Sequence, residues 1–314
     1  MIRLSETPAI AGVLLSAALL LTGCATPQVT ALLEQRPALP ERTELTAVPF
    51  YPQELYQCGP AALATTLVYA GVSTSTDALV PQVYLPEREG SLQAEMLAAT
   101  RRHGLVAYRL APQLQDVLRE VAAGTPVIVL QNLAFSFAPL WHYAVAVGYD
   151  LPREEIILRS GTTQRLIMTL SNFERTWARS QYWAMVSLPL ERLPVSATED
   201  AYVAAVAALE RGSPAAARRA YVRALERWPR NLLARIGLGN AAYAMRDLGA
   251  AEAAYRDATH HHPEAADAWN NLAQALLELG RKDEARAAAQ RAVALGGPRL
   301  AQYQATLKTI VESR

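Results

Sequence analysis

A 34-residue period runs through the last third of the sequence and restricts the fold of that region more than any other feature. Self-similarity at a fixed period of this length is the signature of stacked repeats, in which each unit buries its apolar face against its neighbours. The period predicts three helical repeats over residues 198–231, 232–265 and 266–299. Small residues recur at two positions of the repeat and chain breakers at a third: Ala217, Ala251 and Ala285; Ala224, Ala258 and Ala292; Pro229, Pro263 and Gly297.

On these small residues, on the breakers, and on Tyr221 and Tyr255 at a further shared position, the repeat resembles the tetratricopeptide family. The resemblance implies two antiparallel helices per copy, packed closely through the small residues, and a concave surface that binds a peptide or a protein partner. The segment 300–314 has apolar residues at helical spacing. It is predicted to form a helix that caps the last repeat.

The N-terminus carries the pattern of a secretory signal. Arg3 precedes an apolar stretch of 13 residues, from Ala9 to Leu21. A helix needs about 20 residues to span a bilayer, so this stretch suits the core of a signal peptide better than a membrane span. Small residues directly before Cys24 resemble the bacterial lipobox. The resemblance implies a signal peptide over residues 1–23 and a lipid on Cys24, the alternative being an ordinary signal peptide with an incidental cysteine.

The residues after Cys24 extend this prediction. Ala25 follows the cysteine where an aspartate would signal retention, so the resemblance implies the cell envelope, at the outer membrane of a Gram-negative bacterium. Residues 24–46 contain three prolines and mixed charges, and they are predicted to form a tether between the lipid and the first domain.

The charge balance bears on the kind of partner. Lys and Arg number 30 and Asp and Glu 29, a net charge of +1, which argues against a nucleic-acid binder that depends on a strong positive field. The sequence holds two cysteines, too few for a disulfide-stapled scaffold. No motif resembles a metal cluster, a phosphate-binding loop or a dinucleotide fingerprint, so no cofactor and no metal are expected.

Residues 47–190 read as a helical first half followed by strand-like runs. Cys58 directly precedes an alanine-rich apolar stretch, predicted to be a helix over residues 60–69. The partial positive charge at a helix N-terminus favours a thiolate, the form that a nucleophilic cysteine needs. Strand-like runs follow at 126–130, 141–150, 155–161 and 182–188, the second and third predicted to pair as a hairpin. A helix followed by an antiparallel sheet predicts an α+β domain.

Three blocks of this domain resemble the bacteriocin-processing, double-glycine cysteine peptidases of the papain-like group: PFYPQ at 49–53, CGPAA at 58–62 and HYAVAVGY at 142–149. The resemblance implies a papain-like fold over residues 47–190. It also implies that Cys58 is the nucleophile and His142 the general base and acid. Gln53 would donate its side-chain amide to the oxyanion hole, beside the Cys58 backbone amide. Gln57, directly before the cysteine, is the alternative donor.

The sequence departs from that family at the residue that orients the histidine. The family usually has an aspartate on the next strand, a position that falls here on Ser160. Asp150 is the nearest carboxylate, but eight residues of extended strand, roughly 26 Å, separate it from His142. Asn132 is a further possibility, although it reads as a turn residue. A serine hydroxyl stabilises imidazolium less than a carboxylate does, which predicts weakened, substrate-restricted or absent catalysis.

These observations support three hypotheses. The first is a membrane-tethered cysteine peptidase that cleaves a peptide or protein substrate, held at the membrane by lipid on Cys24, with repeats that recruit substrate or a protein partner. The second is a pseudo-peptidase whose cleft binds a peptide without cleaving it, as Ser160 favours. The third is an acyl transferase, in which an amine intercepts the thioester. None of the three involves nucleic acid.

Overall fold

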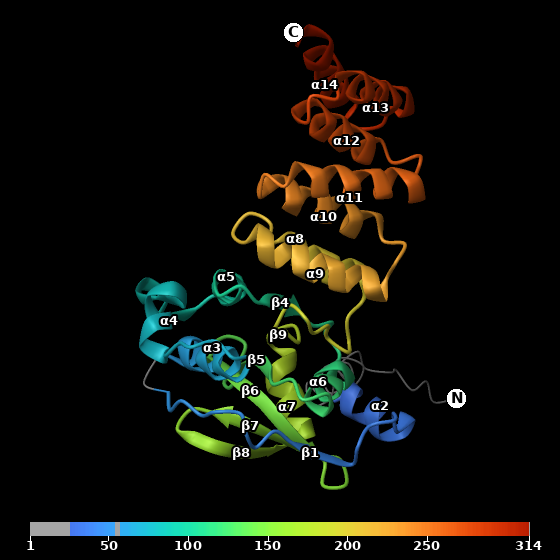
Figure 1. Ribbon diagram of the computed structural model, residues 1–314. Helices are drawn as coiled ribbons and strands as arrows, with labels where there is room; N and C mark the ends of the chain where they lie inside the picture. Colours follow the sequence, from blue (N-terminus) through green and yellow to red (C-terminus); the bar gives the residue numbers. More distant parts are fainter. Residues whose placement is uncertain (1–25, 54–56, 314) are drawn as a thin grey trace, which may run out of the picture.

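The computed structural model describes residues 26–53 and 57–313, which form an α+β domain followed by an all-helical domain (Figure 1). The predicted signal peptide over residues 1–23 and the predicted lipid site at Cys24 lie outside the described residues. In the described part of the chain, no helix combines the length and the apolar character that a bilayer span requires.

The α+β domain is built on an antiparallel sheet of seven strands with the order β4-β9-β5-β6-β7-β8, and β1 pairs with β6. β6 is the longest strand, and its first half pairs with β5 while its second half pairs with β7. The strands are β1 (Arg42–Glu44), β4 (Val106–Arg109), β5 (Val127–Asn132), β6 (Trp141–Asp150), β7 (Glu155–Ser160), β8 (Thr163–Thr169) and β9 (Ala184–Leu188).

Helices cover both faces of this sheet, and each face has its own apolar core. On one face pack α3 (Cys58–Tyr69), α4 (Thr76–Val83) and α5 (Gln93–Arg102), next to the short ladder of β2 (Tyr84–Leu85) and β3 (Gly90–Ser91) with the turn η2 (Pro86–Arg88) between them. On the other face pack α2 (Pro27–Gln35), α6 (Leu114–Ala122) and α7 (Leu170–Ala178). The predicted α+β class is confirmed, and so is the predicted hairpin, because β6 and β7 pair antiparallel.

The predicted tether over residues 24–46 is wrong for the part of it that the structure describes. α2 buries Val29 and Leu32 in the domain core, and β1 pairs with β6. The Glu174 carboxylate on α7 accepts hydrogen bonds from the backbone amides of Gln28 at 3.0 Å and Val29 at 2.8 Å. Pro27 does not interrupt α2, because it occupies the first helical turn, where its missing N–H would have no hydrogen-bond partner within the helix. Within the described residues, the folded domain therefore already includes α2.

The second domain consists of consecutive helix pairs that stack upward from the first domain in Figure 1. The alanines that repeat every 34 residues are buried between the helices, as their small size predicts. The capping helix covers the last pair with Tyr303 and Ile310 buried. The helices are α8 (Glu199–Ala207), α9 (Pro214–Arg227), α10 (Leu232–Ala244), α11 (Leu248–His261), α12 (Ala266–Glu278), α13 (Lys282–Leu295) and α14 (Leu300–Glu312).

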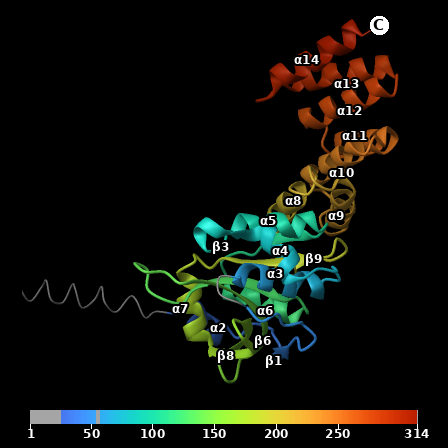
Figure 2. The ribbon, with the colours of Figure 1, turned by 90° about the vertical axis from the view of Figure 1, so that its left-hand side faces the viewer.

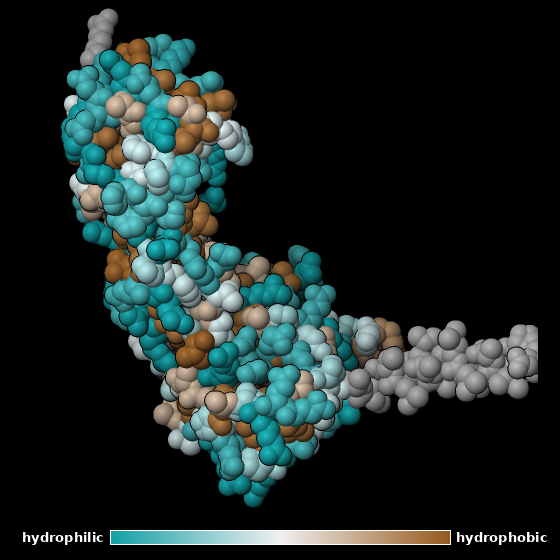
Figure 3. Space-filling view, turned by 90° about the vertical axis from the view of Figure 1, so that its right-hand side faces the viewer, coloured by the Kyte–Doolittle hydropathy of each residue, from teal (hydrophilic) through white to brown (hydrophobic). Residues whose placement is uncertain are grey.

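The two domains share one continuous core instead of meeting through a flexible linker. α8 packs on β4, and the rings of Tyr108 and Tyr202 lie 6.5 Å apart within a cluster that contains residues of both domains. The buried Glu120 accepts hydrogen bonds from the backbone and hydroxyl groups of Ser196, at 2.8 and 2.7 Å. On the side drawn in Figure 3, most of the surface is hydrophilic and apolar side chains are scattered over both domains.

Gly237 tests how closely the repeat helices pack. A β-carbon at this position would lie 2.2 Å from the Tyr221 ring, so Gly237→Ala must displace the ring and should cost about 1–3 kcal/mol of unfolding free energy. Gly249→Ala is the matched control, because nothing lies within 4 Å of the added methyl group, and helix propensity should make it neutral or stabilising by up to about 1 kcal/mol. Denaturant midpoints measure both, and equal midpoints would contradict the close packing.

Candidate active site

Cys58 is the first residue of α3 and lies where this helix meets β3 and β6. Close packing holds the start of the helix in place. A β-carbon at Gly59 would fall 2.2 Å from the Ser91 hydroxyl oxygen, so only glycine lets α3 approach β3 this closely. From the other side, the Tyr143 hydroxyl donates to the backbone carbonyl of Ser91 at 3.1 Å. These contacts fix the thiol beside the beginning of β6.

Burial raises the pKa of the Cys58 thiol, and backbone amides that donate to the sulfur, those of Tyr143, Gly59 and Cys58 itself, oppose the rise. The net direction is upward, so the resting group at neutral pH is a thiol. The expectation of a thiolate stabilised by the helix N-terminus is therefore wrong for the resting state. Desolvation outweighs the amide groups at this position.

His142 lies on β6, and its Nε2 is 2.8 Å from the Ser160 hydroxyl at the end of β7. His142 and Ser160, predicted to pair, are therefore in direct contact. When the hydroxyl oxygen accepts from Nε2–H, the lone pair of Nδ1 is left free to accept a proton. Burial lowers the pKa of His142, so the imidazole is neutral near pH 7. Among the described residues, the His142 ring bonds to Ser160 and not to the Cys58 thiol. The thiol sulfur instead accepts from the backbone amide of Tyr143, the residue after His142.

Gln53 lies against the same pair of strands. Its backbone N–H donates to the Gly161 carbonyl at 3.1 Å, and its side-chain Nε2 lies 3.5 Å from the Tyr143 carbonyl. Within the described ranges, its buried Oε1 has no hydrogen-bond partner. The amide group is therefore held loosely beside the residue that contacts the Cys58 sulfur. Gln57 caps α3 through its backbone, without a side-chain cap hydrogen bond.

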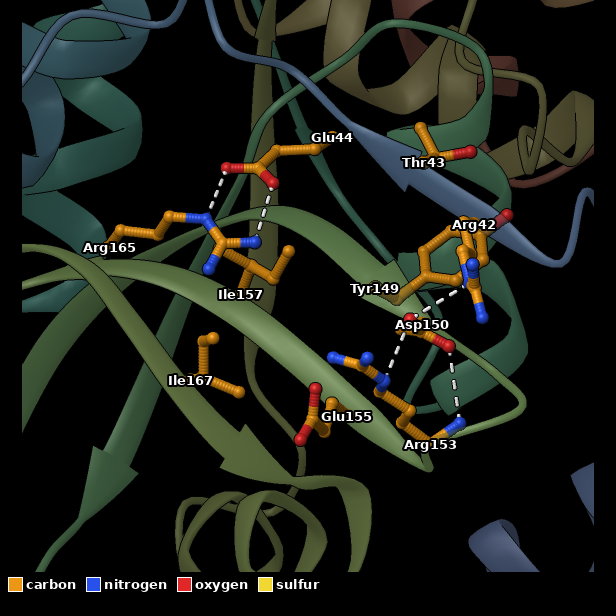
Figure 4. A pocket seen from close by; sticks show the side chains of 10 residues that line it. All are labelled: Arg42, Thr43, Glu44, Tyr149, Asp150, Arg153, Glu155, Ile157, Arg165 and Ile167. Carbon is orange, nitrogen blue, oxygen red and sulfur yellow. Dashed lines mark hydrogen bonds and ion pairs between the residues drawn. The ribbon is translucent and has the colours of Figure 1, made fainter.

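The other two groups considered as orienters of His142 have different partners. Asp150 is at the far end of β6, where it pairs with Arg42 at 2.9 Å and Arg153 at 3.8 Å (Figure 4). These ion pairs line a cavity of about 240 Å³ that Glu44 and Arg165 also border. Asn132 organises the loop after β5 through its own side chain. Neither contacts the imidazole, which leaves Ser160.

Tyr143 is the site residue that the sequence did not reveal. Its flanking position next to His142 predicts either groove lining or sheet packing. The structure gives it a larger part: the backbone amide faces the Cys58 sulfur, the hydroxyl bonds to Ser91, and the ring meets Trp183 edge to face at 5.7 Å between centroids. Strand alternation could have indicated this, because it places Tyr143 on the face of the sheet that carries α3.

Comparison with known proteins agrees with the two-domain description. Residues 45–185 match the Peptidase_C39 like family, and residues 202–258 and 236–299 match a tetratricopeptide repeat family. No curated protein matches the chain. The chain therefore combines a C39-like peptidase domain with tetratricopeptide repeats.

Solved structures with similar parts include representatives of both domains. A C39-like peptidase from Bacillus anthracis is 20% identical, with a TM-score of 0.40, over 48% of this chain and 98% of its own. A thermophilic TPR protein from Thermus thermophilus is 22% identical, with a TM-score of 0.32, over 34% of this chain and 63% of its own. The TPR2B domain of yeast Sti1 is 15% identical, with a TM-score of 0.31, over 35% of this chain and 98% of its own.

The raised pKa of Cys58 predicts how alkylation depends on pH. In protein carrying Cys24→Ser, the rate of Cys58 modification by iodoacetamide should be slower at pH 7 than that of a small free thiol. It should inflect above the ordinary cysteine pKa of about 8.5. His142→Ala should leave this inflection in place, because the resting thiol is not paired with an imidazolium. A thiolate plateau below pH 7 that disappears in His142→Ala would contradict the prediction.

Proposed function

We propose that this chain is a cysteine peptidase of the cell envelope, anchored by lipid on Cys24, that cleaves peptide or protein substrates at Cys58. One observation carries the proposal: Cys58 is the first residue of α3, which packs on β6, and His142 near the start of β6 is held by Ser160. A nucleophile and a base presented by adjoining elements, with a third group on the base, make up the arrangement of thiol and serine hydrolases. The repeats recruit the substrate or a protein partner.

Because the Cys58 thiol and the His142 imidazole are both neutral at rest, the first step includes a proton transfer between them. Nδ1 of His142 accepts the thiol proton as the Cys58 sulfur attacks the scissile carbonyl, which requires the two side chains to close up when substrate binds. The carbonyl oxygen becomes an oxyanion. The Cys58 backbone amide and the loosely held Gln53 amide are the donors that stabilise it, and such a donor contributes about 3 kcal/mol in other enzymes.

In the later steps, the proton passes to the leaving amine and the Cys58 thiol is regenerated. The imidazolium donates its proton to the leaving amine as the C–N bond breaks, which leaves a thioester on Cys58. His142 then removes a proton from water, the water oxygen attacks the thioester, and the thiol is regenerated with the carboxylic product. Ser160 keeps the ring oriented through these transfers, but its hydroxyl carries no charge to stabilise the imidazolium.

A binding-only function is the second candidate. Two observations favour it: a hydroxyl group stands where the related peptidases usually have a carboxylate, and burial raises the pKa of Cys58. In that case the domain binds a peptide beside a thiol that does not react. Acyl transfer differs from peptidase activity only in the last step, where an amine replaces water, and it would give amide products when amines are added.

Substitution at Ser160 tests its positioning role. Ser160→Asp should place a carboxylate against Nε2, raise the pKa of His142 by about one unit and increase kcat/KM about tenfold on a peptide that the wild-type protein cleaves. Ser160→Ala should lower kcat/KM by a similar factor. Because the base must be unprotonated, the acid limb should lie below the ordinary histidine pKa of about 6.5 in the wild type and move to higher pH in Ser160→Asp. An unchanged rate and acid limb in Ser160→Ala would contradict the role.

Peptidase activity itself is tested by comparing cells that express wild-type protein or Cys58→Ala at equal levels. New N-termini in the secreted and envelope proteomes should be present with the wild type and lost with Cys58→Ala, because the substitution removes the nucleophile. Cys24→Ser is the control that separates anchoring from chemistry. Identical N-termini in all cells, with the protein well expressed, would leave the binding function.

A further inference from the structure

An exposed apolar hairpin connects β5 to β6, directly before His142. Asn132 and Trp141 pair at its neck, and the Leu133 amide donates to the Leu140 carbonyl at 2.9 Å. No charged residue occurs between Gln131 and Tyr143. The exposed fractions are high for apolar side chains: Leu133 45%, Phe135 66%, Phe137 87%, Leu140 57% and Trp141 50%.

The fold holds this hairpin in one shape. The buried Asn132 side chain accepts hydrogen bonds from the amides of Ala134 at 3.1 Å and Leu140 at 2.9 Å. From α7, Arg179 donates to the carbonyls of Asn132 at 3.0 Å and Ala134 at 2.7 Å. At the tip, the rings of Phe135 and Phe137 stack with centroids 5.3 Å apart. A supported apolar tip of this kind indicates a binding surface, because soluble proteins rarely expose large contiguous apolar patches.

The start of the described chain and the neck of the hairpin are both attached to α7. Thr26 caps α2, whose first amides are held by Glu174 of α7, and Arg179 at the end of α7 holds the hairpin neck. Five residues of helix span about 7.5 Å, so both attachments are close together on α7. Figure 2 shows the green hairpin projecting to the left, past α7. Cys24 is two residues before Thr26, within about 7 Å even in fully extended chain.

We infer that the hairpin inserts its apolar tip into the bilayer to which Cys24 is anchored, an inference that rests on the proposed lipid at Cys24. Because residues 27–35 belong to the folded domain as α2, lipid on Cys24 holds α7 and the hairpin against the membrane surface. Leucine and aromatic side chains partition into the interfacial region of a bilayer. The exposed Arg179, which holds the neck, and the exposed Arg175, one helical turn before it, attract anionic headgroups.

The position of His142 gives this docking a functional consequence. Trp141 belongs to the neck, and His142 is the next residue on β6. The imidazole is therefore close to the membrane surface when the tip is inserted. Substrates cleaved by this site are then those whose scissile bond lies close to the membrane, such as the membrane-proximal segments of envelope proteins.

Vesicle flotation tests the inference. Protein spanning residues 24–314 with Cys24→Ser contains every described helix and strand but cannot carry the lipid. It should float with vesicles of phosphatidylethanolamine and phosphatidylglycerol. The double variant Phe135→Ser, Phe137→Ser should lower the partition coefficient at least about tenfold, the loss expected for two apolar side chains. The matched control Val222→Ser, Leu233→Ser removes two exposed apolar side chains from the repeats and should change it less than about twofold.

The outcomes separate docking from anchoring and from substrate binding. Equal flotation of the wild-type hairpin and the double variant, or no flotation of either, overturns the inference. A double variant that floats like the wild type but loses peptide cleavage would show that the tip binds substrate, and this also overturns it. Thermal unfolding midpoints should be unchanged, since the substituted side chains are exposed. Mass spectrometry of the protein from cells tests lipid on Cys24 separately, so failure of the anchor and failure of hairpin docking are distinguishable.

Discussion

The register of β6 is the constraint on which the active site depends. One end of this strand provides His142 and the Tyr143 amide that faces the Cys58 sulfur, and the strand is paired along its whole length. β5 fixes the first half, while β7 and β1 fix the second half from opposite edges. β1 can approach because residue 148 is a glycine. A β-carbon at this position would lie only 2.7 Å from the Thr43 carbonyl oxygen. A slip of one residue would exchange the faces of His142 and Tyr143 and separate the imidazole from Ser160.

Local signals in the sequence predict much of this fold, and contacts between distant segments account for what they miss. The 34-residue period predicts the stacked repeats, and the apolar runs predict α3 and the strands β5, β6, β7 and β9. α2 and β1 look like a linker because their stabilising partners, Glu174 and Tyr149, are more than 100 residues away in sequence. β8 is an edge strand with mostly exposed side chains, so it carries little of the apolar signal that identifies a strand.

In the candidate active site, too, local sequence signals predict some features, and contacts between distant segments determine the others. Counting residues around the hairpin places Ser160 opposite Ala144, because Val145 pairs with Arg159. His142 is two residues from Ala144 on the same face of β6, within diagonal reach of the Ser160 hydroxyl. The ionisation of Cys58 could not be predicted, because it depends on burial, which α3, β3 and β6 create together. A helix N-terminus alone favours the thiolate, but the desolvation that close packing at Gly59 brings has the opposite and larger effect.

The core that the two domains share fixes the orientation of the repeats relative to the sheet of the first domain. Packing of Tyr202 on Tyr108, and the bonds from Ser196 to Glu120, resist rotation of the first repeat against the sheet. In Figure 2 the repeats rise across the direction in which the hairpin projects. With the hairpin in a bilayer on the left of this view, the repeats rise away from the membrane as well as along it. A partner bound by the repeats is then held farther from the lipid than α3, so a substrate cleaved at Cys58 has to extend from the repeats back toward the membrane surface.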